Sequence, residues 1–313
     1  MHEVKLSGAV TVRIADEVRA AMAQGRPVVA LESTLISHGL PQPRNLEVAR
    51  RLESVVRDGG AVPATIGIIG GQPIVGLSDA ELQVLATAEG IRKCSRRDIA
   101  IAVARGEHGA TTVAGTLALM GLAGLSVLAT GGIGGVHRGA EQTFDISADL
   151  VELARSTAIV VCAGAKALLD LPRTIEVLET AGVPILGWRT DELPAFYSSA
   201  SGLPVTTRIE SATEAARIAL AGWRLGLSGG VLVGVPPPSG TTLANDRIER
   251  SLAEALREAD RRGLRGPDVT PFLLRAVGEA TGGESVEANL ALLENNARVG
   301  AEIAVALSHE SSR

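Results

Sequence analysis

The sequence predicts an α/β protein with three layers, α/β/α, around a mixed, largely parallel sheet, with a helical segment at its C-terminal end. Short apolar, β-branched runs alternate with helical patterns along most of the chain, which favours parallel strands covered by helices on both faces. Aromatic residues make up only 2% of the 313 residues, whereas glycines number 36. The core is therefore expected to consist of Ala, Val, Leu and Ile, with tight turns between strands and helices.

Strands are predicted where a short apolar run is bounded by turn residues, at 27–31, 64–69, 73–75, 126–129, 158–162, 184–187 and 231–235. Apolar periodicity predicts helices at 14–24, 46–57, 251–262 and 285–307. Two capping boxes, Ser78 with Glu81 and Ser211 with Glu214, open two further helices, the second of which extends to about Leu225. Because no repeat or linker interrupts this pattern, residues 1–313 are expected to form a single domain.

Charge and cysteine content limit the expected partners and compartment. The net charge is −5 at pH 7, and no run of Lys and Arg forms a stripe that could follow a phosphate backbone. Binding of a nucleic-acid polymer is therefore not expected, although a single nucleotide needs only a local site. The two cysteines, Cys94 and Cys162, fit neither a disulfide framework nor a zinc site. Together with the lack of a signal-like apolar segment near residue 1, they predict a cytoplasmic protein.

One uncharged stretch, residues 110–136, is long enough to span a bilayer. Glycines interrupt it throughout, and its hydrophobic pattern changes after Gly124. It is therefore predicted to be a buried helix, a turn, a strand and a glycine loop, and no membrane partner is expected.

A carboxylate and an amine each follow a predicted strand, and ligands of α/β sheets bind beyond the carboxyl ends of the strands. Glu32 closes the apolar run 27–31, where partial desolvation favours the protonated form that a general acid needs. A salt bridge or a helix dipole would explain the same carboxylate. Lys166 follows the strand 158–162 through three small residues, and a desolvated amine is a nucleophile toward carbonyl carbon. A surface lysine is the alternative.

Two further polar segments follow the strand 126–129. The glycine loop, residues 129–139, gathers backbone N–H groups and carries His137 and Arg138, which suits an anion but is also typical of a tight turn. After it, Asp145 and Asp149 lie four residues apart on either side of Ser147. Ser147 is a natural helix N-cap, and the two carboxylates could instead hold a hard divalent cation or sugar hydroxyls.

Two other places supply polar groups. Lys93 is expected at the same rim of the sheet, as a point charge for a phosphate. On the last predicted helix, Asn289, Asn296 and Gly300 share one otherwise apolar face. Such amides contact either neighbouring segments of the protein or the carbonyl and N–H groups of a base.

Taken together, these segments resemble the pseudouridine-5′-phosphate glycosidase family, also called the indigoidine synthase A-like family. The strings that carry the resemblance are ALESTLISHGLP, PATIGIIGG, GLSDAEL, KCSRRDIA, GATTVAGT, ATGGIGGVHRGAEQTFDISADL, VVCAGAKALLDLPRT, TDELPAFY and ANLALLENNA. They extend from about residue 27 to about residue 300. The resemblance implies a single three-layer α/β/α domain that assembles as a homotrimer.

The resemblance also implies roles for individual residues. Glu32 would be the proton donor, Lys166 the covalent nucleophile and Asp145 the protein ligand of one largely water-coordinated Mn²⁺ ion. Asn289 would contact the base. The other substrate-binding groups would be Lys93, the backbone at Val113, Ser147, Ala148 and Asp149. The sequence departs from the family pattern at Cys94, where a branched aliphatic residue is common, and at residues 235–240, where VPPPSG replaces an Asn-Pro stretch. Only the second departure puts a possible contact in doubt.

The expected reaction is the reversible cleavage of pseudouridine 5′-phosphate to uracil and ribose 5-phosphate. Pseudouridine joins ribose C1′ to a carbon of uracil, so there is no heteroatom leaving group to protonate, and the two-carboxylate glycosidase route is poorly suited to the bond. An adduct between a lysine and the ring-opened sugar can serve as the electron sink while an acid protonates the departing carbon.

The sequence also allows three other functions. The chain could act on another C-nucleotide or sugar phosphate, or it could bind a nucleotide or sugar phosphate without catalysis. The glycine loop also suggests a nicotinamide-dependent dehydrogenase, but it lacks the G-x-G-x-x-G spacing of that class. The presence of both the lysine and the acid favours the enzyme.

Overall fold

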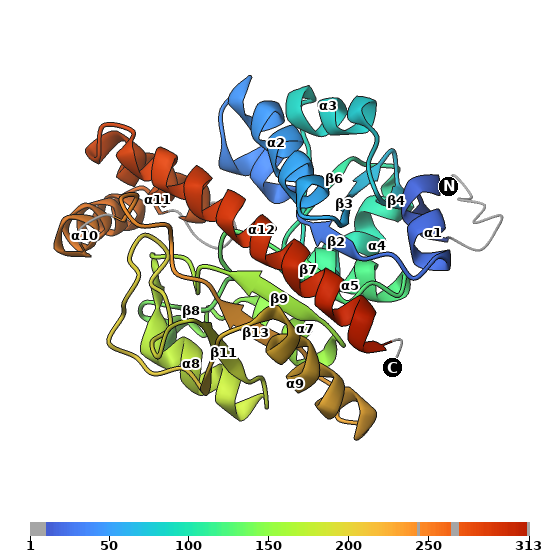
Figure 1. The fold of residues 1–313 in the computed structure, drawn as a ribbon. Coiled ribbons are helices and arrows are strands. Elements are labelled where there is room, and N and C mark those ends of the chain that lie inside the picture. The colour runs from blue at the N-terminus through green and yellow to red at the C-terminus, as the bar shows by residue number, and fades with distance from the viewer. Residues whose placement is uncertain (1–10, 243–244, 264–268, 312–313) are drawn as a thin grey trace.

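The computed structural model describes residues 11–242, 245–263 and 269–311, and within them eleven strands form one sheet with helices on both faces (Figure 1). The main part of the sheet is parallel. Its strand order is β3 (Val62–Ile69), β2 (Val28–Leu31), β7 (Val127–Ala129), β9 (Ile159–Cys162), β13 (Val231–Gly234), β11 (Ile185–Trp188) and β12 (Thr207–Ile209). This arrangement confirms the predicted fold class.

The sheet becomes mixed beyond β3. The second half of β3 pairs antiparallel with β4 (Gln72–Val75) and with β6 (Gly109–Thr111). At the edges, β1 (Arg13–Ile14) pairs with β4 and β5 (Arg92–Cys94) pairs with β6, both in parallel. A separate two-stranded ribbon joins β8 (Val136–His137) to β10 (Leu169–Asp170).

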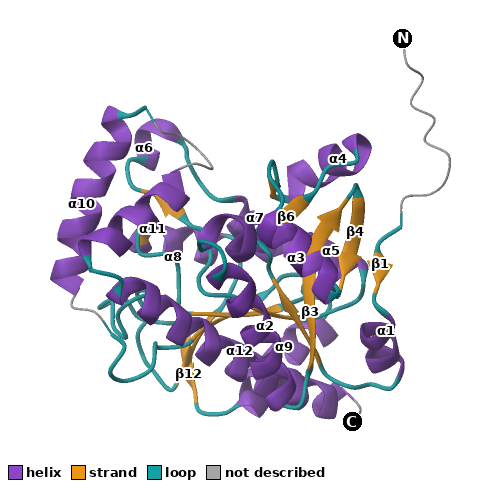
Figure 2. Ribbon diagram, turned by 90° about the horizontal axis from the view of Figure 1, so that it is seen from above, coloured by secondary structure: helices purple, strands orange, loops and turns teal. Residues whose placement is uncertain are grey.

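Helices cover the sheet in two layers (Figures 1 and 2). On one face, α12 (Glu284–Ser311) crosses β2, β7 and β9 and packs between α2 (Arg44–Asp58) and α9 (Ala212–Arg224). On the other face lie α5 (Val113–Leu122) and α7 (Ala148–Arg155), which pack against each other. The remaining helices are α1 (Asp16–Ala23), η1 (Leu35–Gly39), α3 (Asp79–Thr87), α4 (Arg96–Arg105), α6 (Ala140–Thr143), α8 (Leu171–Thr180), α10 (Asn245–Arg261) and α11 (Val269–Ala280).

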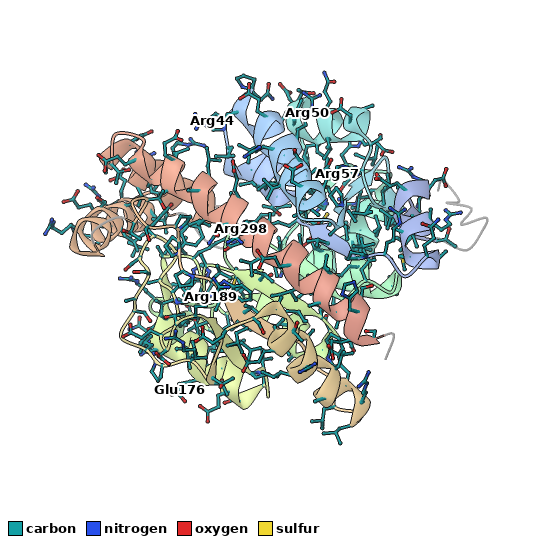
Figure 3. The ribbon with its side chains drawn as sticks, viewed as in Figure 1. Arg44, Arg50, Arg57, Glu176, Arg189 and Arg298 are labelled. Carbon is teal, nitrogen blue, oxygen red and sulfur yellow. The ribbon has the colours of Figure 1, made fainter. Side chains whose placement is uncertain are left out.

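The core lies between these layers and the sheet. Every residue of β2, β9 and β13 is buried. This explains why these strands read as continuous apolar runs rather than as alternating patterns. Charged side chains lie mainly on the outside, where ion pairs join neighbouring helices, as between Arg50 and Asp79 (Figure 3). Such exposed pairs contribute little to stability.

Most of the predicted helices and strands are present. The predicted ends of the helices are less accurate than the predicted positions of the strands. Ser78 and Glu81 form the complete capping box. Ser211 caps α9, but the Glu214 carboxylate accepts the N–H of Glu210 instead of that of Ser211, so the second capping box is only half correct. The first helix begins later than predicted, because Ile14 pairs with β4 as part of β1.

The uncharged stretch 110–136 folds as predicted into the end of β6, the buried helix α5, a turn, β7 and the glycine loop. No helix of the described residues is both long and apolar enough to cross a membrane.

The layered core predicts a large difference between two leucine truncations. Leu128 in β7 is 0% exposed, whereas Leu225 after α9 is 78% exposed. Leu128→Ala is expected to lower the free energy of unfolding by about 2–5 kcal/mol, because it leaves a cavity between the layers. Leu225→Ala should change it by less than about 0.5 kcal/mol. Urea unfolding followed by circular dichroism measures both, and equal effects would contradict the position of the core.

Candidate active site

The candidate residues meet at the point where the strand order of the sheet reverses. From β2 the chain continues to β3 on one side, whereas from β7 it continues to β9 on the other. Ligands of α/β sheets bind at such a switch point, beyond the carboxyl ends of the strands. Because Leu31 of β2 is in register with Ala129 of β7, the next residues, Glu32 and Thr130, are brought together. The Thr130 hydroxyl donates a hydrogen bond to Glu32 Oε1 at 2.7 Å.

Backbone hydrogen bonds continue beyond the ends of β7 and β9 and join the glycine loop to the segment that carries Lys166. The Thr130 N–H donates to the Val161 carbonyl at 3.0 Å, and the Ala163 N–H donates to the Gly131 carbonyl at 2.9 Å. The Lys166 N–H in turn donates to the carbonyl of residue 133 at 3.0 Å. These bonds hold the backbone of Lys166 against the glycine loop that follows Thr130.

Gly164 is required in this segment for two reasons. Its φ is +86°, in the left-handed region that side chains disfavour. A Cβ at this position would also lie 2.0 Å from the Pro194 carbonyl oxygen. The small residues before Lys166 therefore allow another backbone segment to approach closely.

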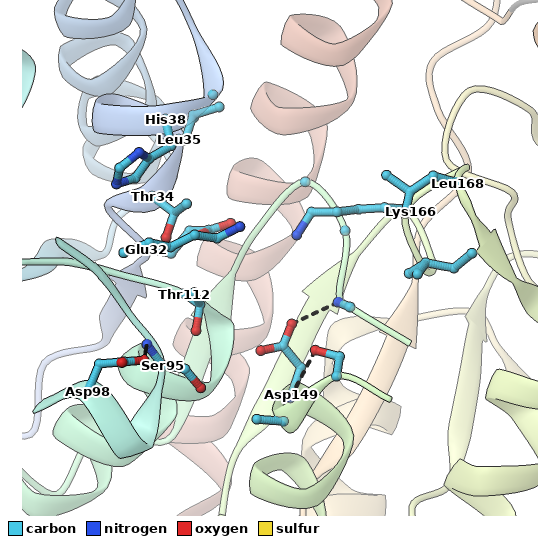
Figure 4. Close-up of a pocket in the computed structure, with 18 of the residues that line it drawn as sticks. Glu32, Thr34, Leu35, His38, Ser95, Asp98, Thr112, Asp149, Lys166 and Leu168 are labelled. Carbon is cyan, nitrogen blue, oxygen red and sulfur yellow. Dashed lines mark hydrogen bonds between the residues drawn. The ribbon is translucent and has the colours of Figure 1, made fainter. Parts of the chain in front are cut away.

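Glu32 and Lys166 face a common cavity of about 790 Å³ (Figure 4). Figure 4 shows the amine of Lys166 directed across this cavity toward Glu32. Glu32 keeps some accessible surface, but desolvation by the surrounding protein raises the pKa of its carboxyl group. The charge of Lys166 and the hydrogen bond from Thr130 oppose this shift without cancelling it.

The cavity collects nearly all of the residues that the sequence singled out. Those that line it are Glu32, Lys93, Asp145, Ser147, Ala148, Asp149, Lys166 and Asn289. Val113 does not line it, because its side chain is buried in the core as the first residue of α5. The adjoining N-cap, Thr112, lines the cavity instead. Cavities of this size hold small-molecule ligands.

The N-termini of three helices border the cavity. The N-caps of α4, α5 and α7, which are Ser95, Thr112 and Ser147, all line it. First-turn N–H groups have no acceptor within their own helix, and the helix dipole adds partial positive charge there. With Lys93 among the lining residues, this side of the cavity suits an anion. Ser147 has the capping role that the sequence predicts, since it accepts the Asp149 N–H.

Asp149 connects two parts of the site. Its Oδ1 accepts the Ala114 N–H at 2.8 Å, and its Oδ2 accepts the Gly134 N–H at 2.7 Å. The carboxylate therefore ties the first turn of α5 to the glycine loop. Each oxygen retains one further acceptor position.

Asp145 lies at the rim, with its side chain 41% exposed. Its Oδ2 is 3.8 Å from Nδ1 of His137, and burial lowers the pKa of that imidazole despite the nearby carboxylate. Among residues 11–242, 245–263 and 269–311, no three carboxylate, imidazole or thiol side chains converge as ligands of a metal ion. Because Asp149 is bound to backbone N–H groups, Asp145 is the more available of the two carboxylates that the sequence paired.

Asn289 and Asn296 separate into two roles. Asn289 lines the cavity. Asn296 is fully buried, and its Nδ2 donates to the carbonyls of Thr130 at 2.8 Å and Gly131 at 3.3 Å. Gly300 packs against Ala129, so this face of α12 lies directly on the switch point.

One wall of the cavity was not predicted. The π-helix η1 contributes Leu35 and His38, its N-cap contributes Thr34, and Phe196 comes from the segment after β11. The string STLISHG directly after Glu32 was a usable signal, since it continues from a strand end into the same edge of the sheet. π-Helices are frequent at functional sites, but their sequence pattern is not distinctive.

A three-layer α/β fold that gathers a desolvated carboxyl group, a lysine and an anion-binding side at its switch point defines an enzyme that handles small anionic molecules. The profile of the family described as Indigoidine synthase A like protein matches residues 17–306. The chain belongs to this family.

Similar proteins extend over almost the whole chain. A protein of Caldanaerobacter subterraneus subsp. tengcongensis named pseudouridine-5′-phosphate glycosidase is 55% identical over 94% of this chain and 96% of its own. One of Chloroflexus aurantiacus with the same name is 55% identical over 95% and 98%. Among solved structures, the prealnumycin C-glycosynthase AlnA in complex with ribulose 5-phosphate has a TM-score of 0.90 and 44% identity over 98% of this chain and 100% of its own. An indigoidine synthase A-like protein of Thermotoga maritima has a TM-score of 0.87 and 39% identity over 96% and 97%.

The close approach at Gly164 predicts a localised stability effect. Gly164→Ala and Gly182→Ala both place a side chain at positive φ, +86° and +72°, which costs about 1–2 kcal/mol. Only at Gly164 does the new Cβ meet backbone atoms, since nothing lies within 4 Å at Gly182. Gly164→Ala should therefore lower the free energy of unfolding by about 1–3 kcal/mol more than Gly182→Ala. Chemical denaturation of the two variants makes the comparison, and equal losses would contradict the contact with Pro194.

Proposed function

We propose that this protein catalyses the reversible cleavage of the C–C glycosidic bond of pseudouridine 5′-phosphate, giving uracil and ribose 5-phosphate. The observation that carries the proposal is the pair Lys166 and Glu32 at one cavity, with the amine directed toward a carboxyl group whose pKa burial raises. Membership of the family and the names of relatives 55% identical to this chain support the same substrate.

The two residues suffice for a balanced reaction. Glu32 protonates O4′ as the C1′–O4′ bond breaks and the Lys166 amine bonds to C1′. The resulting ammonium of Lys166 returns a proton to Glu32. Glu32 then protonates C5 of uracil while the C1′–C5 bond breaks, and the nitrogen lone pair forms an iminium ion with C1′. Addition of water and cleavage of the C1′–N bond release ribose 5-phosphate and restore the amine.

The rest of the cavity suits the two ends of this substrate. Lys93 and the first turns of α4, α5 and α7 offer positive charge and N–H groups for the phosphate and nearby sugar oxygens. Ser147, Ala148 and Asp149, together with the backbone at Val113, belong to these first turns. The amide of Asn289 would contact the base, since Asn289 lines the same cavity and an amide matches the carbonyl and N–H groups of uracil.

A manganese ion fits the donors around Asp145. One partly exposed carboxylate plus waters is a common way to bind a hard divalent cation, and the lowered pKa of His137 favours a neutral imidazole beside it at pH 7. When bound, the ion would orient and polarise substrate oxygens through its waters. Asp145 would hold the ion, and Glu32 and Lys166 would carry the covalent and proton-transfer steps.

We further propose that the chain forms a single domain and works in the cytoplasm as a homotrimer. A common core cluster that extends from β2 to α12 supports the single domain. Two unpaired, buried cysteines are compatible with a reducing compartment. Exposed apolar side chains beside the cavity, at Phe144, Ile146 and Val151, offer a surface for subunit contact.

Removal of the nucleophile should abolish turnover. Lys166→Ala is expected to lower the rate of uracil release from pseudouridine 5′-phosphate at least ~10³-fold, because it removes the amine that forms the adduct. Borohydride treatment with ribose 5-phosphate should attach the reduced sugar to Lys166, as detected by mass spectrometry of peptides. Lys93→Ala serves as the matched control, since it removes a lysine from the same cavity and should retain the adduct while raising KM.

Normal turnover by Lys166→Ala would refute the adduct. A comparison with uridine 5′-phosphate separates the proposed substrate from other nucleotides or sugar phosphates. Equal rates on the two nucleotides would contradict a mechanism built around the C–C bond, and binding without turnover would indicate a non-catalytic protein.

The metal proposal predicts dependence on Asp145. Dialysis against chelator should abolish uracil release, and added Mn²⁺ should restore it. Asp145→Asn should weaken Mn²⁺ binding at least ~10-fold, because the ion loses its charged protein ligand. Electron paramagnetic resonance of free Mn²⁺ measures this binding without turnover. Asp79→Asn, outside the cavity, should bind as the wild type does, and full activity in excess chelator would remove the ion from the proposal.

A further inference from the structure

We propose that Thr130 and Asn296 are positioning residues that determine which oxygen of Glu32 carries the transferable proton. The inference deepens the proposed function, because it concerns the acid of that reaction. It identifies a connection from the C-terminal helix α12 to the carboxyl group that would protonate the substrate.

Thr130 contacts Glu32 directly. The Thr130 hydroxyl is the donor at 2.7 Å, Glu32 Oε1 is the acceptor, and Thr130 is only 2% exposed. A neutral carboxyl group has one carbonyl-type oxygen and one protonated oxygen. Because Oε1 accepts the Thr130 proton, it takes the carbonyl role, and the acidic proton is left on Oε2. The oxygen that delivers the proton is therefore defined before substrate binds.

Three hydrogen bonds in turn hold Thr130 in place. Its N–H donates to the Val161 carbonyl at 3.0 Å, and its carbonyl accepts Nδ2 of Asn296 at 2.8 Å. The Asn296 amide also reaches the Gly131 carbonyl, and the residue is 0% exposed. With N–H, carbonyl and hydroxyl all bonded, Thr130 has little freedom to turn its side chain away from Glu32.

The Asn296 side chain carries a polar atom that is buried without a partner among the described residues, which supports a role for its amide beyond packing. In the described part of the chain, its buried Oδ1 has no hydrogen-bond partner. An unsatisfied buried carbonyl is destabilising, but an apolar residue at this place on α12 would remove the donor that the buried carbonyl of Thr130 accepts. The donor half of the amide is the half that is used, and its acceptors are the carbonyls next to the acid.

The effect on ionisation has a definite sign. The charged groups that act on Glu32 are Lys166, Lys93 and Asp149. The hydrogen bond from Thr130 favours the carboxylate and so lowers the pKa of Glu32, although desolvation keeps that pKa above its ordinary value. Loss of the bond must therefore raise the pKa further. If kcat requires protonated Glu32, kcat falls as the pH rises through this pKa. Loss of the Thr130 hydrogen bond should therefore move the alkaline limb of the kcat–pH profile to higher pH.

A matched control exists elsewhere in the molecule. The Thr65 hydroxyl donates to Oε1 of Glu53 at 2.6 Å, Thr65 is also 2% exposed, and burial raises the pKa of Glu53 as well. Neither residue lines the cavity that holds Glu32. Thr65→Val therefore removes the same chemical contact from a similar environment outside the site.

The experiment compares Thr130→Val, Thr130→Ser and Thr65→Val in the full chain. Thr130→Val should lower kcat by about 10–100-fold with KM changed less than about twofold, and should shift the alkaline limb of kcat upward. Thr130→Ser should restore both, because it keeps the donor. Thr65→Val should keep the wild-type kcat and pH profile. An unchanged alkaline limb in Thr130→Val, or failure of Thr130→Ser to restore it, would overturn the proposal.

A second measurement does not depend on turnover. Carbon-13 NMR of glutamate carboxyl groups, with the Glu32 resonance assigned through Glu32→Gln, titrates Glu32 directly. Thr130→Val should move this titration to higher pH, and Asn296→Ala should move it in the same direction, whereas Asn295→Ala should not. If the wild type releases no uracil, the proposed function fails while the titration still decides the role of Thr130. Wild-type titration in both Thr130→Val and Asn296→Ala would refute the connection.

Discussion

The site depends on the backbone pairing that continues past the ends of β7 and β9. The N–H groups of Thr130, Ala163 and Lys166 are held by it, although all three residues lie beyond the ends of the regular strands. A lysine side chain has several rotatable bonds, so a fixed backbone is the least costly way to restrict where its amine lies. On the other side of β7, the register with β2 brings Thr130 to Glu32. The relative positions of amine and acid thus follow from the sheet itself rather than from flexible loops.

The cavity holds both a carboxyl group that is neutralised by desolvation and a set of groups that favour an anion. Glu32 is surrounded by the ends of buried strands, where desolvation favours its neutral form. The helix N-termini and Lys93 also line the cavity, and their N–H groups and positive charge favour an anion. Asp149 lines the same cavity, but its charge is balanced by two backbone N–H groups. Lys93 and Asp149 also act on Glu32, in opposite directions, so the ionisation of the acid is coupled to the charge of the anion-binding groups.

The sequence was informative where a single local pattern determines the outcome. Apolar runs predicted β2, β9 and β13, because strands buried on both faces tolerate few polar residues. Glu32 directly follows one such run, and Lys166 follows another after three small residues. These positions predicted their shared cavity. Short strands such as β5 and β6 were missed, since residues 92–94 and 109–111 are polar or small and are strands only because of their partners. The η1 wall could be placed only by its position after Glu32, because a π-helix has no distinctive sequence pattern. The bond from Asn296 to Thr130 depends on a tertiary contact that no local pattern predicts.

The position of α12 in the sequence has a consequence for biosynthesis. This helix follows every strand of the described sheet, yet it packs on β2, β7 and β9 and anchors the glycine loop through Asn296. During translation the strands therefore leave the ribosome before the segment that locks Thr130 in place. Until that segment emerges, the apolar face that it will cover stays open to solvent, so a growing chain is exposed to chaperones and proteases longest on the side that later supports catalysis.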